Sequence, residues 1–208
     1  MIKDKKWFPV VYMFAVTFFF SSIVIGLTQL TADRVEANQE LAFERAVVNV
    51  LPGLHDESKQ VSRMQLHSVF VEEVLPPSDD SAGAYMLEKS GIAEAYALPF
   101  SGQGFWAEIR GVLGISDDMK TVTAVAFYQQ NETPGLGAEI AKPEFTDQFK
   151  GKVFADRGKP LTVKRPSSEL DKSSVHAVTG ATQTSVRLEK MINDAVSQWR
   201  KDMSEGSN

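Results

Sequence analysis

The stretch that decides the fold is VTGATQTSVRLEKMINDAVSQW, residues 178–199. From Val186 onward its apolar residues recur every three or four positions, which is the period of one face of an α-helix. These residues are Leu188, Met191, Ile192, Ala195, Val196 and Trp199. The hydroxyl residues Thr184 and Ser185 precede this face, and either is a natural N-cap. The sequence therefore predicts an amphipathic C-terminal helix.

The start of the same stretch combines a flexible backbone with a hydroxyl. Thr182 follows Gly180 and Ala181 immediately before the helical pattern. Glycine lets a backbone approach a ligand closely, and a helix N-terminus offers unpaired N–H groups and a positive dipole end. This arrangement suits a phosphate group. The same hydroxyls before a helix are also common as plain helix caps.

Upstream, turn residues divide the chain into short elements. We predict strands at residues 69–74, 84–87, 92–98, 107–115, 121–129 and 161–164. The strands at 107–115 and 121–129 form a β-hairpin around a turn with two aspartates. We further predict a glycine-punctuated turn at 99–106, loops at 76–81 and 131–137, and a short helix at 145–149. The expected fold class is α+β, a single domain with a twisted, mostly antiparallel sheet that is packed by helices at one face.

The N-terminus predicts a membrane anchor. Residues 7–31 contain no charge, and a helix needs roughly 20 apolar residues to cross a bilayer core. Lys3, Lys5 and Lys6 precede this run, so the positive-inside rule places the N-terminus in the cytoplasm and the rest of the chain outside. A cleaved signal peptide is the alternative. Either interpretation sends the domain out of the cytoplasm.

The pattern beyond the anchor continues as a helix through residue 50, and Leu51, Pro52 and Gly53 stop it. The predicted organisation is a cytoplasmic N-terminus at 1–6, a transmembrane helix at 7–31, a stalk or first helix with a linker at 32–66, an extracytoplasmic domain at 67–202 and a flexible tail at 203–208.

Composition excludes several classes of function. The chain has no cysteine, which rules out disulfides, a thiol nucleophile, an iron–sulfur cluster and a cysteine zinc site. Its net charge of -5 argues against nucleic-acid binding, because such proteins usually carry a basic face. His55, His67 and His176 lack liganding partners at recognisable spacings, so we expect no metal site.

A second loop gives the 178–185 stretch its meaning. Residues 132–137 read ETPGLG and lie about 45 residues before the Gly-Ala-Thr loop. Residues 102–106 read GQGFW, Phe127 and Tyr128 precede ETPGLG, and Gly151 and Lys152 follow it. Together, in this order and before a final amphipathic helix, these motifs resemble the NqrC/RnfG family of membrane-anchored flavoprotein subunits. The resemblance covers residues 95–200 closely and 7–55 in outline.

The resemblance implies an electron carrier whose FMN is esterified through its phosphate to Thr182. It implies that Thr133, backbone N–H groups and Leu136 line the flavin ring, that Trp106 or Phe105 stacks nearby, and that Lys152 lies near the phosphate or ring or is merely solvated. The flavin carries the redox chemistry, so no catalytic side chain is expected. The expected cofactor-binding residues are Thr182, Thr179, Gly180, Ala181, Thr184, Ser185, Glu132, Thr133, Gly135, Leu136, Gly137, Trp106 and Lys152.

The resemblance also implies partners and a location. The chain is expected in the inner membrane, with its FMN domain on the periplasmic side, as one subunit of an ion-translocating complex. The Nqr type oxidises NADH and reduces quinone, whereas the Rnf type couples ferredoxin and NAD. The 102–106 motif favours Nqr, and the modest chain length favours Rnf slightly. A dedicated flavin transferase, which uses FAD and magnesium, is expected to attach the FMN.

One position departs from the family pattern. The signature has an aspartate six residues before the modified threonine, and this chain has His176 there. If the transferase reads that aspartate, His176 lowers the efficiency of attachment. Two other classes of function stay open on the sequence. One is a stand-alone, membrane-tethered extracytoplasmic flavin reductase, and the other is a non-redox anchored binding or assembly domain in which Thr182 belongs only to a helix cap.

Overall fold

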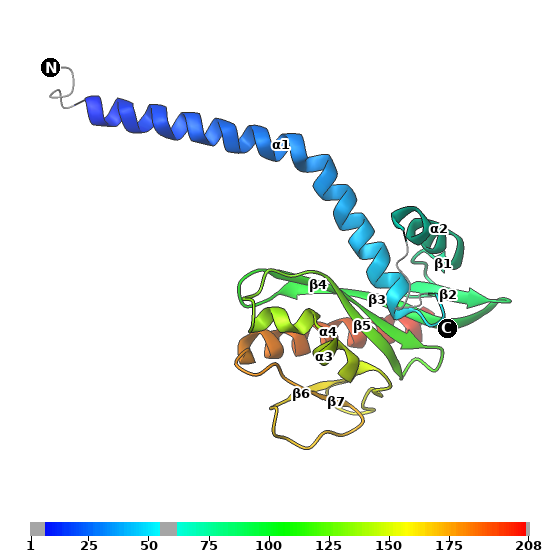
Figure 1. Cartoon of the computed structure of the whole chain (residues 1–208). Coiled ribbons are helices and arrows are strands. Elements are labelled where there is room, and N and C mark those ends of the chain that lie inside the picture. Colours follow the sequence, from blue (N-terminus) through cyan, green and yellow to red (C-terminus); the bar gives the residue numbers. More distant parts are fainter. Residues whose placement is uncertain (1–6, 55–61, 207–208) are drawn as a thin grey trace. The chain divides into compact units, whose positions relative to one another are not determined.

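The computed structural model describes residues 7–54 and 62–206, and Figure 1 shows the chain. The predicted cytoplasmic segment 1–6, His55 and the last two residues of the predicted tail lie outside the described residues. The chain divides into two compact units, one reaching to Glu40 and one beginning at Leu41. Each unit is described by itself.

The first unit is the N-terminal part of helix α1, Phe8–Val50. An 18-residue window of this helix has a mean hydropathy of 2.2, and none of that window is buried. Apolar side chains in water are unfavourable, and a lipid core removes them from it. By length and composition, α1 is the one helix of the described residues that can cross a membrane. The predicted continuation of the helix to residue 50 is confirmed.

The second unit is built on a five-stranded antiparallel sheet in the order β1-β2-β3-β4-β5. The strands are β1 Val74–Leu75, β2 Tyr85–Lys89, β3 Ile92–Gln103, β4 Glu108–Ser116 and β5 Val122–Gln129. Strand order equals chain order, so each strand pairs with the next along the chain. The predicted hairpin of β4 and β5 and the predicted α+β class are both confirmed.

The strand predicted at 69–74 is wrong, because helix α2, Arg63–Glu73, occupies most of that stretch and β1 begins only at Val74. Ser62 and Gln65 form a reciprocal capping box that starts the helix. The Gln65 N–H donates to the Ser62 hydroxyl at 3.3 Å, and the Ser62 N–H donates to the Gln65 side chain at 3.0 Å. These bonds satisfy amides that a helix start otherwise leaves unpaired.

The turn predicted at 99–106 begins too early, because β3 runs on to Gln103. Pro99 pairs with Val112 and Gln103 pairs with Glu108 across β4. Proline lacks the N–H that an inner strand needs on both sides. The pairing with β2 ends at Ala97, so Pro99 lies where β3 has become an edge strand and the missing N–H is tolerated.

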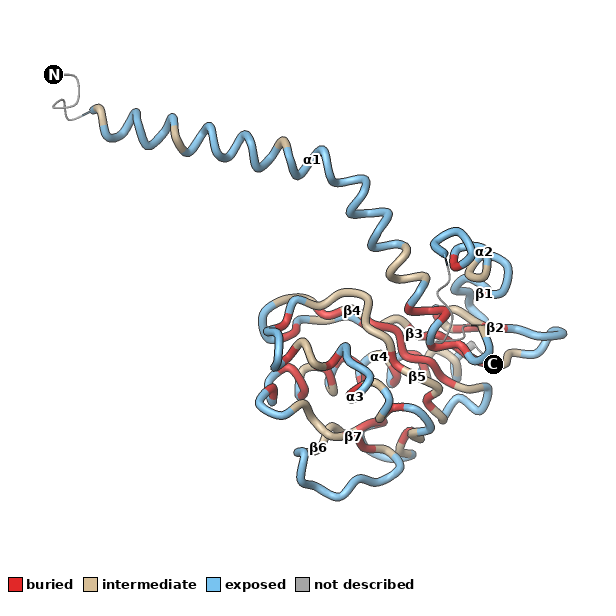
Figure 2. The backbone as a smooth tube through the Cα atoms, in the orientation of Figure 1, coloured by how far each residue is buried: buried red, intermediate tan, exposed pale blue. Residues whose placement is uncertain are grey.

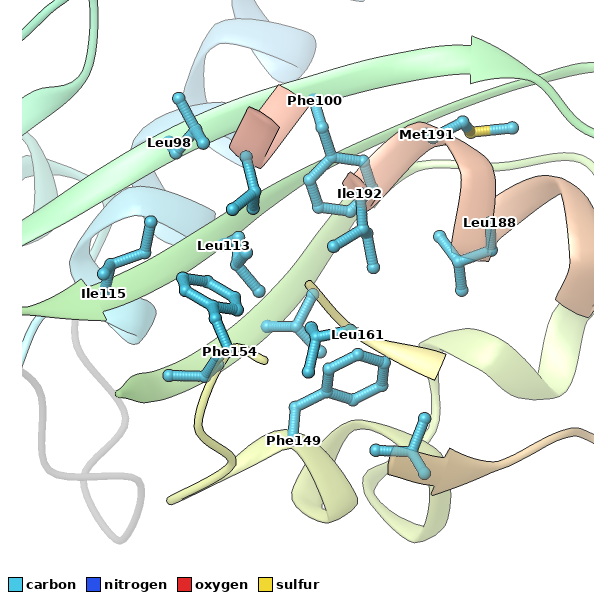
Figure 3. Close-up of a cluster of buried hydrophobic side chains, with 14 of the residues drawn as sticks. Leu98, Phe100, Leu113, Ile115, Phe149, Phe154, Leu161, Leu188, Met191 and Ile192 are labelled. Carbon is cyan, nitrogen blue, oxygen red and sulfur yellow. The ribbon is translucent and has the colours of Figure 1, made fainter. Parts of the chain in front are cut away.

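Helix α4, Thr182–Gly206, packs its predicted apolar face on one side of the sheet. Figure 3 shows Leu188, Met191 and Ile192 of this helix opposite side chains of the strands. The helix begins before the two predicted N-caps, which lie buried in its first turn. The tail predicted at 203–208 is helical through Gly206, as far as the structure describes it.

The opposite face of the sheet is covered by the end of α1. Val47, Val50 and Leu51 are buried there in a cluster with Leu87, Ala95, Ala97 and Val112 of the strands. The Thr123 hydroxyl donates to the Val50 carbonyl at 2.6 Å. Helices therefore cover both faces, rather than the one face that the sequence suggested, and buried residues begin well before residue 67 (Figure 2).

A small parallel sheet lies below the main one, formed by β6, Thr162–Lys164, and β7, Ser174–His176. The predicted strand at 161–164 is confirmed. The buried Asn193 of α4 binds the backbone of Leu161 twice, since its side-chain oxygen accepts the N–H at 2.8 Å and its amide donates to the carbonyl at 2.8 Å. The predicted helix at 145–149 is split into α3, Pro143–Thr146, and η3, Asp147–Phe149, which follow η2, Gly137–Ala141.

Asp171, between β6 and β7, is expected to titrate at unusually low pH. Its bond to the Lys164 ammonium at 2.7 Å, with further bonds from Ser174 and Ser173, lowers the pKa from 3.8 to about 2. Because the folded pKa is the lower one, the stabilisation is present above the unfolded value of 3.8 and is lost as the pH falls through about 2. A carboxyl-detected NMR titration measures this midpoint. Lys164→Met should raise it, whereas a wild-type midpoint near 3.8 would contradict the assignment.

Candidate functional site

A cleft of about 310 Å³ brings together three segments that are distant in the sequence. These are the turn between β3 and β4, the 132–137 loop and the start of α4. The lining residues are Phe105, Trp106, Glu132, Thr133, Leu136, Gly137, Gly180, Ala181, Thr182, Gln183 and Thr184. The two loops that the sequence singled out therefore face one cavity, whose volume is typical of a small-molecule site.

The start of α4 owes its shape to Gly180 and Ala181. Gly180 has a φ of +77°, a left-handed conformation that glycine adopts without strain, and a Cβ there would lie 3.0 Å from Leu136. The Ala181 N–H donates to the Val178 carbonyl at 3.1 Å and closes the turn. Thr182, the first helical residue, is exposed, whereas Ala181 is buried. The sequence thus presents the Thr182 hydroxyl at the rim of the cleft.

The helix also presents backbone donors. Its first i to i−4 bond runs from the Ser185 N–H to the Ala181 carbonyl at 3.0 Å. The N–H groups of Thr182, Gln183 and Thr184 precede this bond and are those that a helix start leaves without an intrahelical acceptor. Unpaired amides at the positive end of a 25-residue helix suit an anion such as a phosphate.

The 132–137 loop is a tight structure of its own. The Thr133 carbonyl accepts the N–H groups of Leu136 and Ala138, both at 3.1 Å. Gly135 has a φ of +76°, and its N–H donates to Glu139 at 3.1 Å. These bonds turn the half-exposed Leu136 side chain into one apolar wall of the cleft.

Two aromatic residues stand at the opposite rim. Phe105 is 47% exposed and Trp106 is 66% exposed, so neither is a core residue. Their rings meet edge to face at a centroid distance of 5.0 Å. Large apolar side chains exposed beside an apolar cavity are typical of a site that a ligand or partner covers.

Not every predicted site residue lines the cleft. Ser185 lies behind it, where its hydroxyl accepts the Val178 N–H at 3.3 Å. The Lys152 ammonium donates to the Asp171 carbonyl at 3.2 Å and is not among the lining residues. Gln183 lines the cleft although the sequence did not single it out. Its position directly after Thr182 in the first helical turn was the available signal.

Gly135 and Thr179 line a neighbouring cavity of about 440 Å³. Lys142 and Glu139 face the same cavity and pair at 2.7 Å. The hydrogen bond from this ammonium lowers the pKa of the Glu139 carboxyl below its usual value. The two residues thus lie on the outer side of the loops that form the cleft.

His176 is held away from the cleft. Its backbone N–H donates to Gln148 at 2.8 Å, and its Nε2 donates to the Ser168 carbonyl at 2.9 Å. It does not line the cleft and fits the expected role of a histidine beside a loop. Within residues 7–54 and 62–206, no group of three or more metal-ligating side chains occurs.

The comparisons with known proteins identify the class. Residues 104–197 match the family described as the FMN-binding domain, and this segment contains all the residues that line the cleft. The chain is an FMN-binding protein of the NqrC/RnfG type.

The relatives are NqrC proteins, which belong to the Na(+)-translocating NADH-quinone reductase. Those of Chlamydia pneumoniae and Chlamydia caviae are each 32% identical, over 64% and 78% of this chain and 40% and 54% of their own length. That of Pseudomonas aeruginosa is 30% identical over 59% of this chain and 53% of its own. The chain thus spans about half the length of the curated relatives it matches.

Solved structures share the fold. The crystal structure of the corresponding protein from Parabacteroides distasonis aligns with a TM-score of 0.65 at 22% identity, covering 81% of this chain and 92% of that one. Shewanella oneidensis NqrC aligns with a TM-score of 0.67 at 19% identity, covering 83% and 99%. The single α+β domain predicted from the sequence is therefore confirmed.

The residues of the cleft fit FMN. Leu136, Phe105 and Trp106 offer apolar surface for a ring system, and Thr133 offers a hydroxyl. The free amides and the exposed hydroxyl of Thr182 lie together at the start of α4 and suit a phosphate. One end of the cleft thus matches the ring of FMN and the other matches its phosphate.

Proposed function

We propose that this chain is the electron-transfer subunit of an Nqr-type membrane complex and carries FMN esterified through its phosphate to Thr182. The observation that carries the proposal is the placement of Thr182. It is the exposed hydroxyl residue at the positive end of α4, at the rim of a cleft within the FMN-binding domain. An ester there leaves the remaining phosphate charge at a helix N-terminus, where it is stabilised.

The other cleft residues then hold the ring. Leu136 on one side and Trp106 with Phe105 on the other exclude water from it, while Thr133 supplies a hydrogen-bonding hydroxyl. FMN, when bound, accepts electrons from one partner and passes them to the next. The protein's part is to position the ring and to tune its readiness to be reduced. Covalent attachment prevents loss of the cofactor on the extracytoplasmic side, where free flavin is dilute.

The chain acts with partners in this proposal. The apolar run at 7–31 anchors it in the cytoplasmic membrane, and the positive-inside rule places the FMN domain outside. That run contains no charged residue for an ion pathway, so other membrane subunits translocate the ion. The matched relatives are Nqr subunits, which agrees with the 102–106 motif and gives no support to the slight preference for Rnf from chain length. A flavin transferase attaches the FMN.

The test is whether flavin survives denaturation. The full-length protein, co-expressed with a flavin transferase and run on a denaturing gel, is expected to give a fluorescent band. Mass spectrometry should place the FMN on the peptide that contains Thr182. A band that is dark after denaturation, from a preparation that is yellow before it, would exclude the ester and leave non-covalent FMN binding. A colourless preparation would overturn the electron-carrier role itself.

A further inference from the structure

Glu132 is a buried carboxylate at the edge of the cleft, with 5% of its surface exposed. Each of its oxygens accepts a hydrogen bond from a different segment. Oε1 accepts the backbone N–H of Trp106 at 3.0 Å, and Oε2 accepts the hydroxyl of Thr184 at 2.7 Å. One side chain thus ties the β3–β4 turn and the first turn of α4 to the 132–137 loop.

The backbone around Glu132 is shaped to admit it. A Cβ at Gly104 would lie 2.5 Å from Oε1, and a Cβ at Gly137 would lie 2.7 Å from Oε2. Real side chains do not approach so closely, so glycine at these two positions makes room for the carboxylate. The contact between Thr184 and Glu132 joins residues 52 positions apart. The three walls of the cleft therefore meet at this carboxylate.

The same geometry indicates that Glu132 carries its negative charge. An ionised carboxylate only accepts hydrogen bonds, and both oxygens are used as acceptors here. The positive end of α4 also favours a negative charge near Thr184. Both donors are neutral groups, so neither cancels the charge. A charge in a poorly hydrated cleft acts on its neighbours more strongly than one in water.

We infer that Glu132 is a positioning residue that locks the three walls of the cleft together and, through its buried charge, sets the reduction potential of the flavin bound there. The inference rests on the proposed FMN site. Reduction adds negative charge to the flavin, and a fixed negative charge beside it disfavours that addition. Glu132 therefore makes the bound flavin harder to reduce, and the Thr184 and Trp106 donors moderate its field.

Two substitutions separate the charge from the geometry. In Glu132→Gln the amide oxygen still accepts from Trp106 and the amide nitrogen donates to the Thr184 oxygen, so the tie is kept and the charge is lost. In Thr184→Val the charge is kept and one donor to it is lost. The measurement is the midpoint potential of the flavin in the full-length protein, by spectroelectrochemistry. Glu88→Gln, an exposed carboxylate on β2, is the matched control.

Opposite shifts are expected. Glu132→Gln should move the potential to more positive values by at least a tenfold change in the reduction equilibrium, about 30 mV for a two-electron couple. Thr184→Val should move it to more negative values, and Glu88→Gln should leave it unchanged. No shift in Glu132→Gln, or shifts of the same sign in both cleft variants, would overturn the inference. If Glu132→Gln does not fold, a shift of zero or positive sign in Thr184→Val overturns it alone.

The flavin content of the wild type keeps the two proposals apart. A colourless wild type refutes the proposed function before any potential is measured. A flavin-loaded wild type, covalent or not, lets the variants test Glu132 independently of the ester. A loaded wild type with unshifted variants leaves the proposed function standing and removes only the role of Glu132.

Discussion

Thr182→Ala is expected to lose all covalently bound flavin. The substitution removes the one oxygen to which the phosphate is proposed to be joined, and no neighbouring hydroxyl is placed to replace it. Thr184 is buried and already donates to Glu132 at 2.7 Å, and Ser185 is buried behind the cleft. The measurement is flavin fluorescence of the denatured protein on a gel, after co-expression with a flavin transferase.

Two control variants separate the loss of the hydroxyl from a general disturbance of the loop. Thr179→Ala removes an exposed hydroxyl that does not line the cleft and should leave the fluorescent band intact. Thr182→Ser keeps the hydroxyl and should keep flavin, in a lower amount. A Thr182→Ala band as bright as the wild type would move the attachment point to another residue, and peptide mass spectrometry would then locate it.

The two loops of the cleft were predictable because their chemistry is local. Gly180 and Gly135 have φ values of +77° and +76°, and glycine is the residue that signals such turns in a sequence. That the loops face one cavity followed from the resemblance to a known family. Nothing local in the chain shows that Glu132 meets Thr184, since this contact depends on how the sheet and α4 pack.

The errors in the fold have physical reasons. The stretch 69–74 contains valines that favour a strand, but the capping box of Ser62 and Gln65 begins a helix ahead of it, and that signal was present in the sequence. The extension of β3 past Pro99 was less accessible. It depends on pairing with β4, which a local pattern does not contain.

Long-range packing also explains the second covered face of the sheet. The residues 41–51 look like an ordinary amphipathic continuation of the anchor helix. Their burial depends on small residues on the strands, since a Cβ at Gly114 would lie 2.4 Å from the carbonyl of Val50. A helix that fits only because a distant strand offers glycine and alanine is invisible to periodicity. The boundary of the domain was therefore the least predictable part of the fold.

Trp199→Ala is expected to be the most destabilising single change in the domain outside the cleft. Trp199 is 2% exposed, its ring lies 5.3 Å from that of Tyr96, and its Nε1 donates to the buried Ser81 carbonyl at 3.0 Å. Truncating a buried tryptophan typically costs about 3–5 kcal/mol, because transfer energy is lost and a cavity remains. The loss should appear as a lower urea midpoint of the full-length protein in detergent, followed by circular dichroism.

Trp199→Phe divides this effect into packing and hydrogen bonding. Phenylalanine keeps most of the ring contact with Tyr96 but leaves the Ser81 carbonyl without its donor, which costs about 1–3 kcal/mol. We expect its midpoint between those of the wild type and Trp199→Ala. Equal midpoints for wild type and Trp199→Ala would mean that α4 is not held by this residue. The rigidity of its first turn, which carries Thr182, would then have to come from Leu188, Ile192 and Asn193 nearer the cleft.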